Sequence, residues 1–241
     1  MVSQSNHEPP GASSFDKLRS SDQLKAPTVF DRLNAIVDVD AAARAGWRPL
    51  DLARAFLDGG ARFLQLRAKT MASGPLLELA AAVTALAHAA GAVVIVNDRA
   101  DLSRLAGADG VHVGQEDLSP AAVRTVAGDE TIVGLSAHTE DQVARAIEEP
   151  VSYVAIGPVF GTATKVTGYD QVGLDMVRAA ARQTRARGLP LVAIGGITLD
   201  NAASVIDAGA SSVAVIGDLL ATGDPERRTR DLLERLLMRR T

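Results

Sequence analysis

The sequence predicts an α/β fold in which eight parallel strands close into a single (β/α)8 TIM barrel. Eight short segments rich in β-branched and apolar residues have the pattern of strands, and Ala- and Leu-rich stretches with the pattern of helices separate them. This alternation is typical of a parallel sheet, and eight repeats are enough to close such a sheet on itself. The length of 241 residues suits one domain of this kind.

The strands are expected where β-branched and apolar residues gather. They cover residues 34–39, 62–67, 92–97, 110–113, 131–136, 152–157, 191–195 and 212–217. Helix start signals fall between them at Ser119-Pro120, at Asp224-Pro225 and at a capping box of Thr139 with Gln142. An open doubly wound sheet is the alternative. We favour the barrel, because no G-x-G-x-x-G follows the first strand and no division into two halves is visible.

Composition narrows the class of protein. The chain has no cysteine, which excludes disulfides, thiolate metal sites and cysteine nucleophiles. Its formal net charge of −4 argues against broad nucleic-acid binding, and no apolar run has the length of a membrane helix. The N-terminus lacks the layout of a signal peptide, so we expect a soluble, cytoplasmic protein.

The first 30 residues differ in character from the rest of the chain. They are polar and interrupted by Pro and Gly, so they bury too little apolar surface to offset the entropy of ordering. We expect residues 1–30 to form a disordered or loosely docked N-terminal extension. The barrel, as the catalytic domain, is then expected over residues 31–241.

The stretch FLQLRAKT, residues 63–70, places polar groups on one face of the second strand. Side chains alternate along a strand, so Leu64 and Leu66 share one face while Gln65, Arg67 and Lys69 share the other. In a barrel the outward face packs on helices, and the inward face at the carboxyl end forms the floor of the active site. The three polar side chains are therefore expected to rise toward that mouth. Ion pairing at the surface of a strand end is the alternative.

Two aspartates follow neighbouring strands. Asn97-Asp98 ends the third strand, and Asp117 lies in the loop after the fourth. Strand ends lie close together in a barrel, and Mg²⁺ typically takes one or two carboxylates and completes its shell with water and phosphate oxygens. Together with the cations of strand two, Asp98 and Asp117 indicate a magnesium site. The alternative is that each aspartate caps the helix that follows it.

The segment after the sixth strand, residues 157–173, is longer than an ordinary connection between a strand and a helix. Long structured loops are frequently functional. Thr162, Thr164 and Lys165 supply hydroxyls and a cation suited to phosphate oxygens, and Gly161 and Gly168 would let the loop move over a ligand.

Glycines end the last two strands. Gly195-Gly196 follows strand seven, with Thr198 placed to cap the next helix, and Ile216-Gly217 follows strand eight. Glycine lets backbone N–H groups approach an anion closely, and phosphate sites of these barrels often lie after strands seven and eight. A tight turn that needs small residues is the alternative reading.

The histidines carry a weaker signal. His112 alternates with valines and fits a barrel-interior residue, whereas His138 follows Ser136 near the mouth and is placed to donate to a substrate.

Six motifs in order carry a resemblance to a known family. They are QLRAK (65–69), VNDRADL (96–102), DGVHVGQEDL (109–118), GLSAHT (134–139), GPVFGTATK (157–165) and AIGGITLDNA (193–202). Over residues 33–220 the chain resembles thiamine phosphate synthase, a (β/α)8 barrel and a transferase. That family joins 4-amino-5-hydroxymethyl-2-methylpyrimidine diphosphate to 4-methyl-5-(2-phosphoethyl)thiazole and releases pyrophosphate, using Mg²⁺ in a dissociative mechanism.

The resemblance also implies roles for individual residues. The pyrimidine diphosphate would be held by Gln65, Arg67, Lys69, Asn97, Ser136 and Lys165, of which Arg67, Lys69, Ser136 and Lys165 would be catalytic. Asp98 and Asp117 would ligate Mg²⁺. The thiazole phosphate would be held by Thr162, Thr164, Gly195, Gly196, Ile216 and Gly217.

Three positions depart from the family pattern. Gly217 stands where a Ser is usual, Gln171 where a Pro is usual, and Asn34 where an aromatic residue is common. These changes bear on the affinity for the substrates and on the shape of the pyrimidine pocket.

Two other functions stay open. One is a thiazole tautomerase of the same fold, which would use a residue such as His138 for proton transfer and needs neither diphosphate nor metal. The other is a non-catalytic barrel that binds a phosphate ligand. Asp98, Asp117 and Asn97 favour the synthase. Its partners would be the two small-molecule substrates, with no nucleic acid and no membrane, and a homo-oligomer stays open.

Overall fold

A closed barrel of eight parallel strands is the framework of the protein. The computed structural model describes residues 31–161 and 170–237. Each strand pairs with the next along the chain, and the last pairs with the first. The strands are β1 (Leu33–Asp38), β2 (Phe63–Arg67), β3 (Val93–Asn97), β4 (Gly110–Val113), β5 (Ile132–Ala137), β6 (Tyr153–Ile156), β7 (Leu191–Ile194) and β8 (Ser212–Val215). The predicted barrel is confirmed, and all eight predicted strands agree with it to within two residues at each end.

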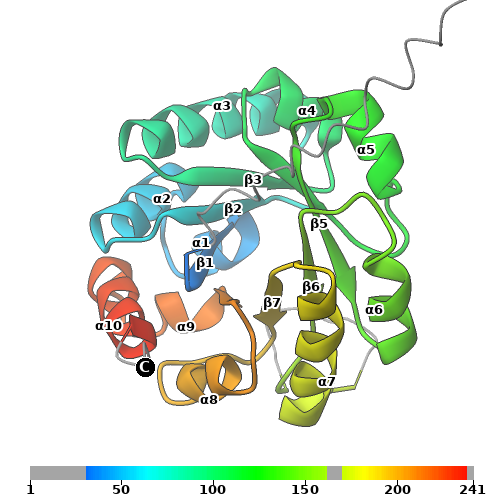
Figure 1. Ribbon diagram of the computed structural model, residues 1–241. Coiled ribbons are helices and arrows are strands. Elements are labelled where there is room, and N and C mark those ends of the chain that lie inside the picture. Colours follow the sequence, from blue (N-terminus) through cyan, green and yellow to red (C-terminus); the bar gives the residue numbers. More distant parts are fainter. Residues whose placement is uncertain (1–30, 162–169, 238–241) are drawn as a thin grey trace, which may run out of the picture.

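Helices surround the barrel (Figure 1). They are α1 (Val39–Arg44), α2 (Pro49–Asp58), α3 (Ser73–Ala89), α4 (Ala100–Leu105), α5 (Pro120–Ala127), α6 (Glu140–Ala146), α7 (Gly173–Ala186), α8 (Ala202–Asp207), α9 (Gly217–Leu220) and α10 (Pro225–Leu237). The last helix, α10, packs against α2, near the start of the chain, and closes the ring. In the part of the chain that the structure describes, no helix combines the length and the apolar character needed to cross a bilayer.

The two faces of the strands pack against different partners. Outward residues such as Leu64 and Leu66 belong to the large core between sheet and helices. Inward residues form a second buried cluster, here called the floor cluster, which fills the interior of the barrel. It consists of Ile36, Phe63, Ile95, Tyr153, Ala155, Val192 and Ala214. Because the floor cluster fills the barrel interior, a ligand can enter only the space between this cluster and the carboxyl ends of the strands.

The predicted caps at Ser119 and Thr139 are confirmed. The N–H of Ala122 donates to Ser119 Oγ at 3.3 Å, and the N–H of Gln142 donates to Thr139 Oγ1 at 3.2 Å. In a capping box, the Gln142 side chain would accept the N–H of Thr139 itself. Here Gln142 Oε1 accepts the N–H of His138, one residue before the cap. These bonds satisfy N–H groups that a helix start leaves free.

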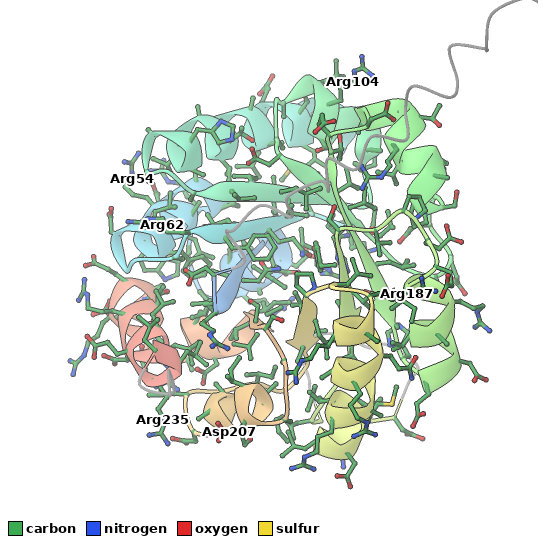
Figure 2. All side chains as sticks on the ribbon, viewed as in Figure 1. Arg54, Arg62, Arg104, Arg187, Asp207 and Arg235 are labelled. Carbon is green, nitrogen blue, oxygen red and sulfur yellow. The ribbon has the colours of Figure 1, made fainter. Side chains whose placement is uncertain are left out.

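Several charged side chains on the helices point away from the barrel. Arg54, Arg104 and Arg235 are exposed on the outer side of the helix layer, where water solvates them (Figure 2). The cations of β2, Arg67 and Lys69, instead line a cavity at the carboxyl ends of the strands. Residues 1–30 and 238–241 lie outside the described residues, so the expected N-terminal extension stays a prediction.

Candidate active site

A cavity of about 440 Å³ opens at the carboxyl ends of the strands. Every predicted site residue within residues 31–161 and 170–237 lines it. These are Gln65, Arg67, Lys69, Asn97, Asp98, Asp117, Ser136, Gly195, Gly196, Ile216 and Gly217. The remaining three, Thr162, Thr164 and Lys165, lie outside the described residues. Side chains separated by up to 152 positions in the sequence thus meet at one mouth.

The polar face of β2 rises toward this mouth as predicted. Gln65 is buried, Arg67 is half-buried and Lys69 is exposed. Arg67 Nη1 forms an ion pair with Oδ2 of Asp38, whose side chain is 4% exposed. The other carboxylate oxygen of Asp38 accepts the N–H of Ala41 at 2.8 Å and so caps α1. Sequence reasoning missed Asp38; the signal available was an acid at the end of the strand beside β2.

Lys69 also has a carboxylate partner. Its Nζ forms an ion pair with Asp98 Oδ2. Asp98 has a φ of +64°, a left-handed conformation that aspartate tolerates better than most residues, and its N–H donates to the carbonyl of His112 at 2.8 Å. The N-cap of α4 is Arg99 and carries no side-chain cap bond, so the alternative in which Asp98 caps this helix is wrong.

Asp117 faces the same space. Its Oδ2 accepts the N–H of Gly114 at 2.8 Å, and the cap of α5 is Ser119, so the capping alternative is wrong here too. Burial raises the pKa of the Asp98 carboxyl, the ion pair with Lys69 opposes this shift, and the carboxylate of Asp117 adds to it. The Asp117 carboxylate therefore lies near enough to Asp98 to favour its protonated form.

This pair fits the needs of Mg²⁺. Within the described ranges no three His, Cys, Asp or Glu side chains form a metal cluster. Magnesium does not require one, since it is usually bound through one or two carboxylates plus water and substrate phosphates. The Asp117 carboxylate raises the pKa of Asp98, and a divalent cation held by the two carboxylates would oppose that effect.

Ser136 is held from two sides. The amide of Gln115 donates to its carbonyl at 2.6 Å, and its Oγ lies 2.8 Å from His112 Nε2. His112 is 9% exposed, which confirms it as a barrel-interior residue, and its Nδ1 lies 2.9 Å from the hydroxyl of Tyr153. Sequence reasoning missed Tyr153, because nothing local in the sequence connects it to Ser136. His138 lines the cavity as well, with its Nδ1 2.5 Å from the carbonyl of Gly157.

The described ends of the segment after β6 are bonded together. The N–H of Gly161 donates to Gln171 Oε1 at 3.0 Å, and the N–H of Val172 donates to the carbonyl of Pro158 at 2.8 Å. Gln171 thus forms a bond that a Pro side chain at this position could not form. The predicted Gly168 hinge lies outside the described residues.

The glycines after β7 are required by packing. Gly195 and Gly196 have φ of +102° and +63°. A Cβ on Gly195 would lie 2.5 Å from Pro158 Cβ, and one on Gly196 would lie 2.5 Å from the carbonyl oxygen of Gly161. Residues 158–161 therefore lie directly on this turn, as the small-residue alternative expects, while the turn also faces the cavity.

The predicted cap at Thr198 is wrong. The N-cap of α8 is Asn201, and its Oδ1 accepts the N–H of Thr198 at 2.8 Å. The Asn201 amide also donates to the carbonyl of Gly196 at 3.0 Å. The Asn201 side chain thus holds the turn that precedes α8, and Thr198 does not stand at the N-cap position predicted for it.

A carboxylate near the end of β8 forms an ion pair with an arginine. Asp218 lines the cavity next to Gly217. It forms bonds of 2.7 and 3.0 Å with the guanidinium of Arg228 on α10 and accepts the N–H of Leu199 at 3.1 Å. This pairing lowers the repulsion that Asp218 would exert on an anion in this part of the cavity.

Comparison with known proteins gives a consistent family. The family model for thiamine monophosphate synthase matches residues 33–219. The thiamine-phosphate synthase of Koribacter versatilis is 44% identical over 216 residues, covering 88% of this chain and 96% of its own. The thiamine-phosphate synthase of Thermus thermophilus is 45% identical over 197 residues, covering 80% of this chain and 93% of its own. Among solved structures, the thiamine phosphate pyrophosphorylase of Pyrococcus furiosus is 27% identical with a TM-score of 0.77, covering 86% of this chain and 96% of its own.

Proposed function

The chain belongs to the thiamine monophosphate synthase family and is a transferase of thiamine biosynthesis, and from this premise we propose the substrates and residues of its reaction. The substrates are 4-amino-5-hydroxymethyl-2-methylpyrimidine diphosphate and 4-methyl-5-(2-phosphoethyl)thiazole. The products are thiamine phosphate and pyrophosphate.

One observation carries this proposal. Two cations, Arg67 and Lys69, and two carboxylates, Asp98 and Asp117, line the same mouth of the cavity. A diphosphate carries several negative charges, so its binding and departure call for positive charge at the position it occupies. Arg67 is paired with Asp38 and Lys69 with Asp98. Each ion pair holds the cationic side chain in place before a ligand arrives.

The pyrimidine subsite has a polar wall above an apolar floor. Gln65, Asn97 and Ser136 present two amides and a hydroxyl to the cavity, and Ile36 and Tyr153 of the floor cluster lie below them. A flat heterocycle with ring nitrogens and an amino group matches this combination. The diphosphate would extend from the ring toward Arg67.

Asp98 and Asp117 would hold Mg²⁺. When bound, the ion neutralises the negative charge that develops on the departing pyrophosphate. Lys69 remains beside Asp98 and adds positive charge at the same position.

The thiazole phosphate would lie on the opposite side of the mouth. Gly195, Gly196, Ile216 and Gly217 line that side, and the pairing of Asp218 reduces repulsion there. Thr162, Thr164 and Lys165 are proposed to complete this subsite and to reach the diphosphate.

The proposed reaction is dissociative. The bond between the pyrimidine methylene carbon and the diphosphate oxygen breaks, and the electron pair leaves with pyrophosphate. The thiazole nitrogen then donates its lone pair to the pyrimidinylmethyl cation and forms the new C–N bond. The chain needs no covalent nucleophile for this reaction. Its residues bind the charges and align the two rings, which is a positioning task.

The two alternative functions are less favoured. Neither a thiazole tautomerase nor a non-catalytic phosphate-binding barrel needs the paired carboxylates Asp98 and Asp117. We propose the two small-molecule substrates as its partners, with no nucleic acid and no membrane.

A direct assay tests the proposal. The purified protein is mixed with both substrates and Mg²⁺, and thiamine phosphate and pyrophosphate are measured by chromatography. We expect both products in equal amounts, and neither when one substrate is omitted. Failure to form them, with the protein folded and both substrates intact, would overturn the proposed function.

A further inference from the structure

Three side chains form a continuous line of hydrogen bonds from the barrel interior to the cavity. Tyr153 Oη lies 2.9 Å from His112 Nδ1, and His112 Nε2 lies 2.8 Å from Ser136 Oγ. Tyr153 is 0% exposed and His112 is 9% exposed, whereas Ser136 is half-buried at the cavity wall. The line therefore joins a phenol that water cannot reach to a hydroxyl that a ligand can.

The fold holds this line rigidly. The rings of His112 and Tyr153 stack with centroids 5.5 Å apart and an interplanar angle of 24°, and Phe63 packs edge-on against Tyr153 at 6.0 Å. Gly134 makes the arrangement possible. A Cβ at this position would lie 2.1 Å from Tyr153 Cζ and 2.5 Å from His112 Nδ1. Only glycine at position 134 leaves room for this phenol beside this imidazole.

The chemistry of the three groups gives the line a direction. A neutral imidazole donates through one nitrogen and accepts through the other. A phenol is a stronger acid than an aliphatic alcohol and hence the stronger hydrogen-bond donor, whereas the alcohol is the better acceptor. Burial raises the pKa of the Tyr153 phenol, so this group keeps its proton. The favoured arrangement therefore has Tyr153 donating to Nδ1 of His112, and Nε2–H of His112 donating to Ser136 Oγ.

This direction determines what Ser136 can offer a ligand. Its oxygen is occupied as an acceptor by the imidazole, and its own proton is free to rotate toward the cavity. In the reverse arrangement, the Ser136 hydroxyl would donate its proton to Nε2 of His112. It would then present only lone pairs to the cavity, which would repel a diphosphate oxygen or a ring nitrogen.

We propose that Tyr153 and His112 are positioning residues that set His112 as the Nε2–H tautomer and so aim the hydroxyl proton of Ser136 at an acceptor atom of the pyrimidine diphosphate. The identity of this ligand rests on the proposed function; the tautomer does not.

The first test measures the tautomer directly. The uniformly ¹⁵N-labelled full-length protein is studied without ligand by long-range ¹H–¹⁵N NMR, with the spectrum of His112→Gln identifying the signals among the four histidines. We expect an unprotonated Nδ1 and a protonated Nε2 for His112 in the wild type at neutral pH. A protonated Nδ1 with an unprotonated Nε2, or an imidazole with both nitrogens protonated, would overturn the proposal.

The second test asks whether Tyr153 acts through Ser136. Tyr153→Phe removes the hydroxyl and keeps the ring, and its effect is measured with Ser136 present and in a Ser136→Ala background. We expect kcat to fall about five- to tenfold in the first case, the size of one lost hydrogen bond, and by less than twofold in the second. An equal fall in both backgrounds would show a merely structural role, and no fall in the first would also contradict the proposal.

A matched control separates this effect from general loosening of the core. Ser212 also carries a buried barrel-interior hydroxyl, on β8 beside Val192 of the floor cluster, and it does not line the cavity. Ser212→Ala should leave kcat within twofold of the wild type. If the wild type forms no thiamine phosphate, the proposed function fails, and the NMR measurement still decides the tautomer.

Discussion

Asp38 and Arg67 face each other across the first two strands of the barrel. Their Cα atoms are partners in the β1–β2 register, and their side chains form an ion pair in which the Asp38 side chain is 4% exposed and the Arg67 side chain 15%. The same carboxylate caps α1 through the N–H of Ala41. Arg67 is therefore fixed in the cavity wall by the chain itself, and its remaining N–H groups are available to a ligand.

Removing the charge of Asp38 should lower the stability of the folded protein. In Asp38→Asn, the amide oxygen still accepts from Ala41, but Arg67 is left as a largely buried cation without its partner. We expect the free energy of unfolding to fall by about 3 kcal/mol, measured by urea denaturation. The control is Asp51→Asn at the exposed Arg48–Asp51 pair, where a loss below about 1 kcal/mol is expected. Equal losses in the two variants would contradict this interpretation.

The glycine under the Tyr153 ring should not tolerate a side chain. In Gly134→Ala, the new methyl group would lie 2.1 Å from Tyr153 Cζ, so strands or rings must shift. We expect a loss of about 1–3 kcal/mol in the free energy of unfolding, together with reduced activity. Gly74 on α3 is the matched control, since a Cβ there meets nothing within 4 Å. Gly74→Ala should be neutral or stabilising, and a neutral Gly134→Ala would show that the interior is not tightly packed.

Asn34 lies in the barrel wall with a buried amide. It is 1% exposed, and neither its Nδ2 nor its Oδ1 has a hydrogen-bond partner among the described residues. An unpaired buried polar group costs about 1–3 kcal/mol, so Asn34→Leu should raise the free energy of unfolding by about 1 kcal/mol. Urea denaturation of the ligand-free protein measures this. A fall in stability would mean that the amide is satisfied in solution.

The pKa of Asp98 predicts a dependence of stability on pH without metal. Burial and the neighbouring carboxylate of Asp117 raise the pKa of Asp98 in the folded chain against the opposing ion pair with Lys69. A raised pKa means that the folded chain binds the proton more tightly than the unfolded chain does. The stability from Asp98 is therefore fully present below the ordinary pKa, about 4, and is lost as pH rises through the raised value.

Asp98→Asn isolates this dependence, because an amide does not titrate in this range. Free energies of unfolding are measured for both proteins from pH 4 to pH 8 in EDTA. We expect the wild type to lose stability relative to Asp98→Asn as pH rises. A constant difference, or one that changes in the opposite direction, would contradict the raised pKa.

Local patterns were sufficient to predict the fold. Alternation of apolar residues locates each strand, and the inward set of Gln65, Arg67 and Lys69 follows from a period of two residues. Strand ends meet in any such barrel, so the convergence of Asp98 and Asp117 also followed from topology.

Contacts that depend on register were not predictable from local sequence. Asp38 meets Arg67 because β1 and β2 pair at that register, and Tyr153 reaches His112 across 41 positions of sequence. The sequence predicts Thr198 as the cap of α8, but the turn after β7 extends to Asn201, which stands at the N-cap position without a side-chain cap bond. Such details are decided by tertiary packing.

We propose that Asp98 and Asp117 hold a divalent ion that assists departure of pyrophosphate, and the rate of coupling at limiting Mg²⁺ decides whether they do. We expect Asp98→Ala and Asp117→Ala to keep a cooperative unfolding transition and to lose Mg²⁺-dependent formation of thiamine phosphate. Full activity of both variants at limiting Mg²⁺ would show that these two carboxylates do not hold the ion.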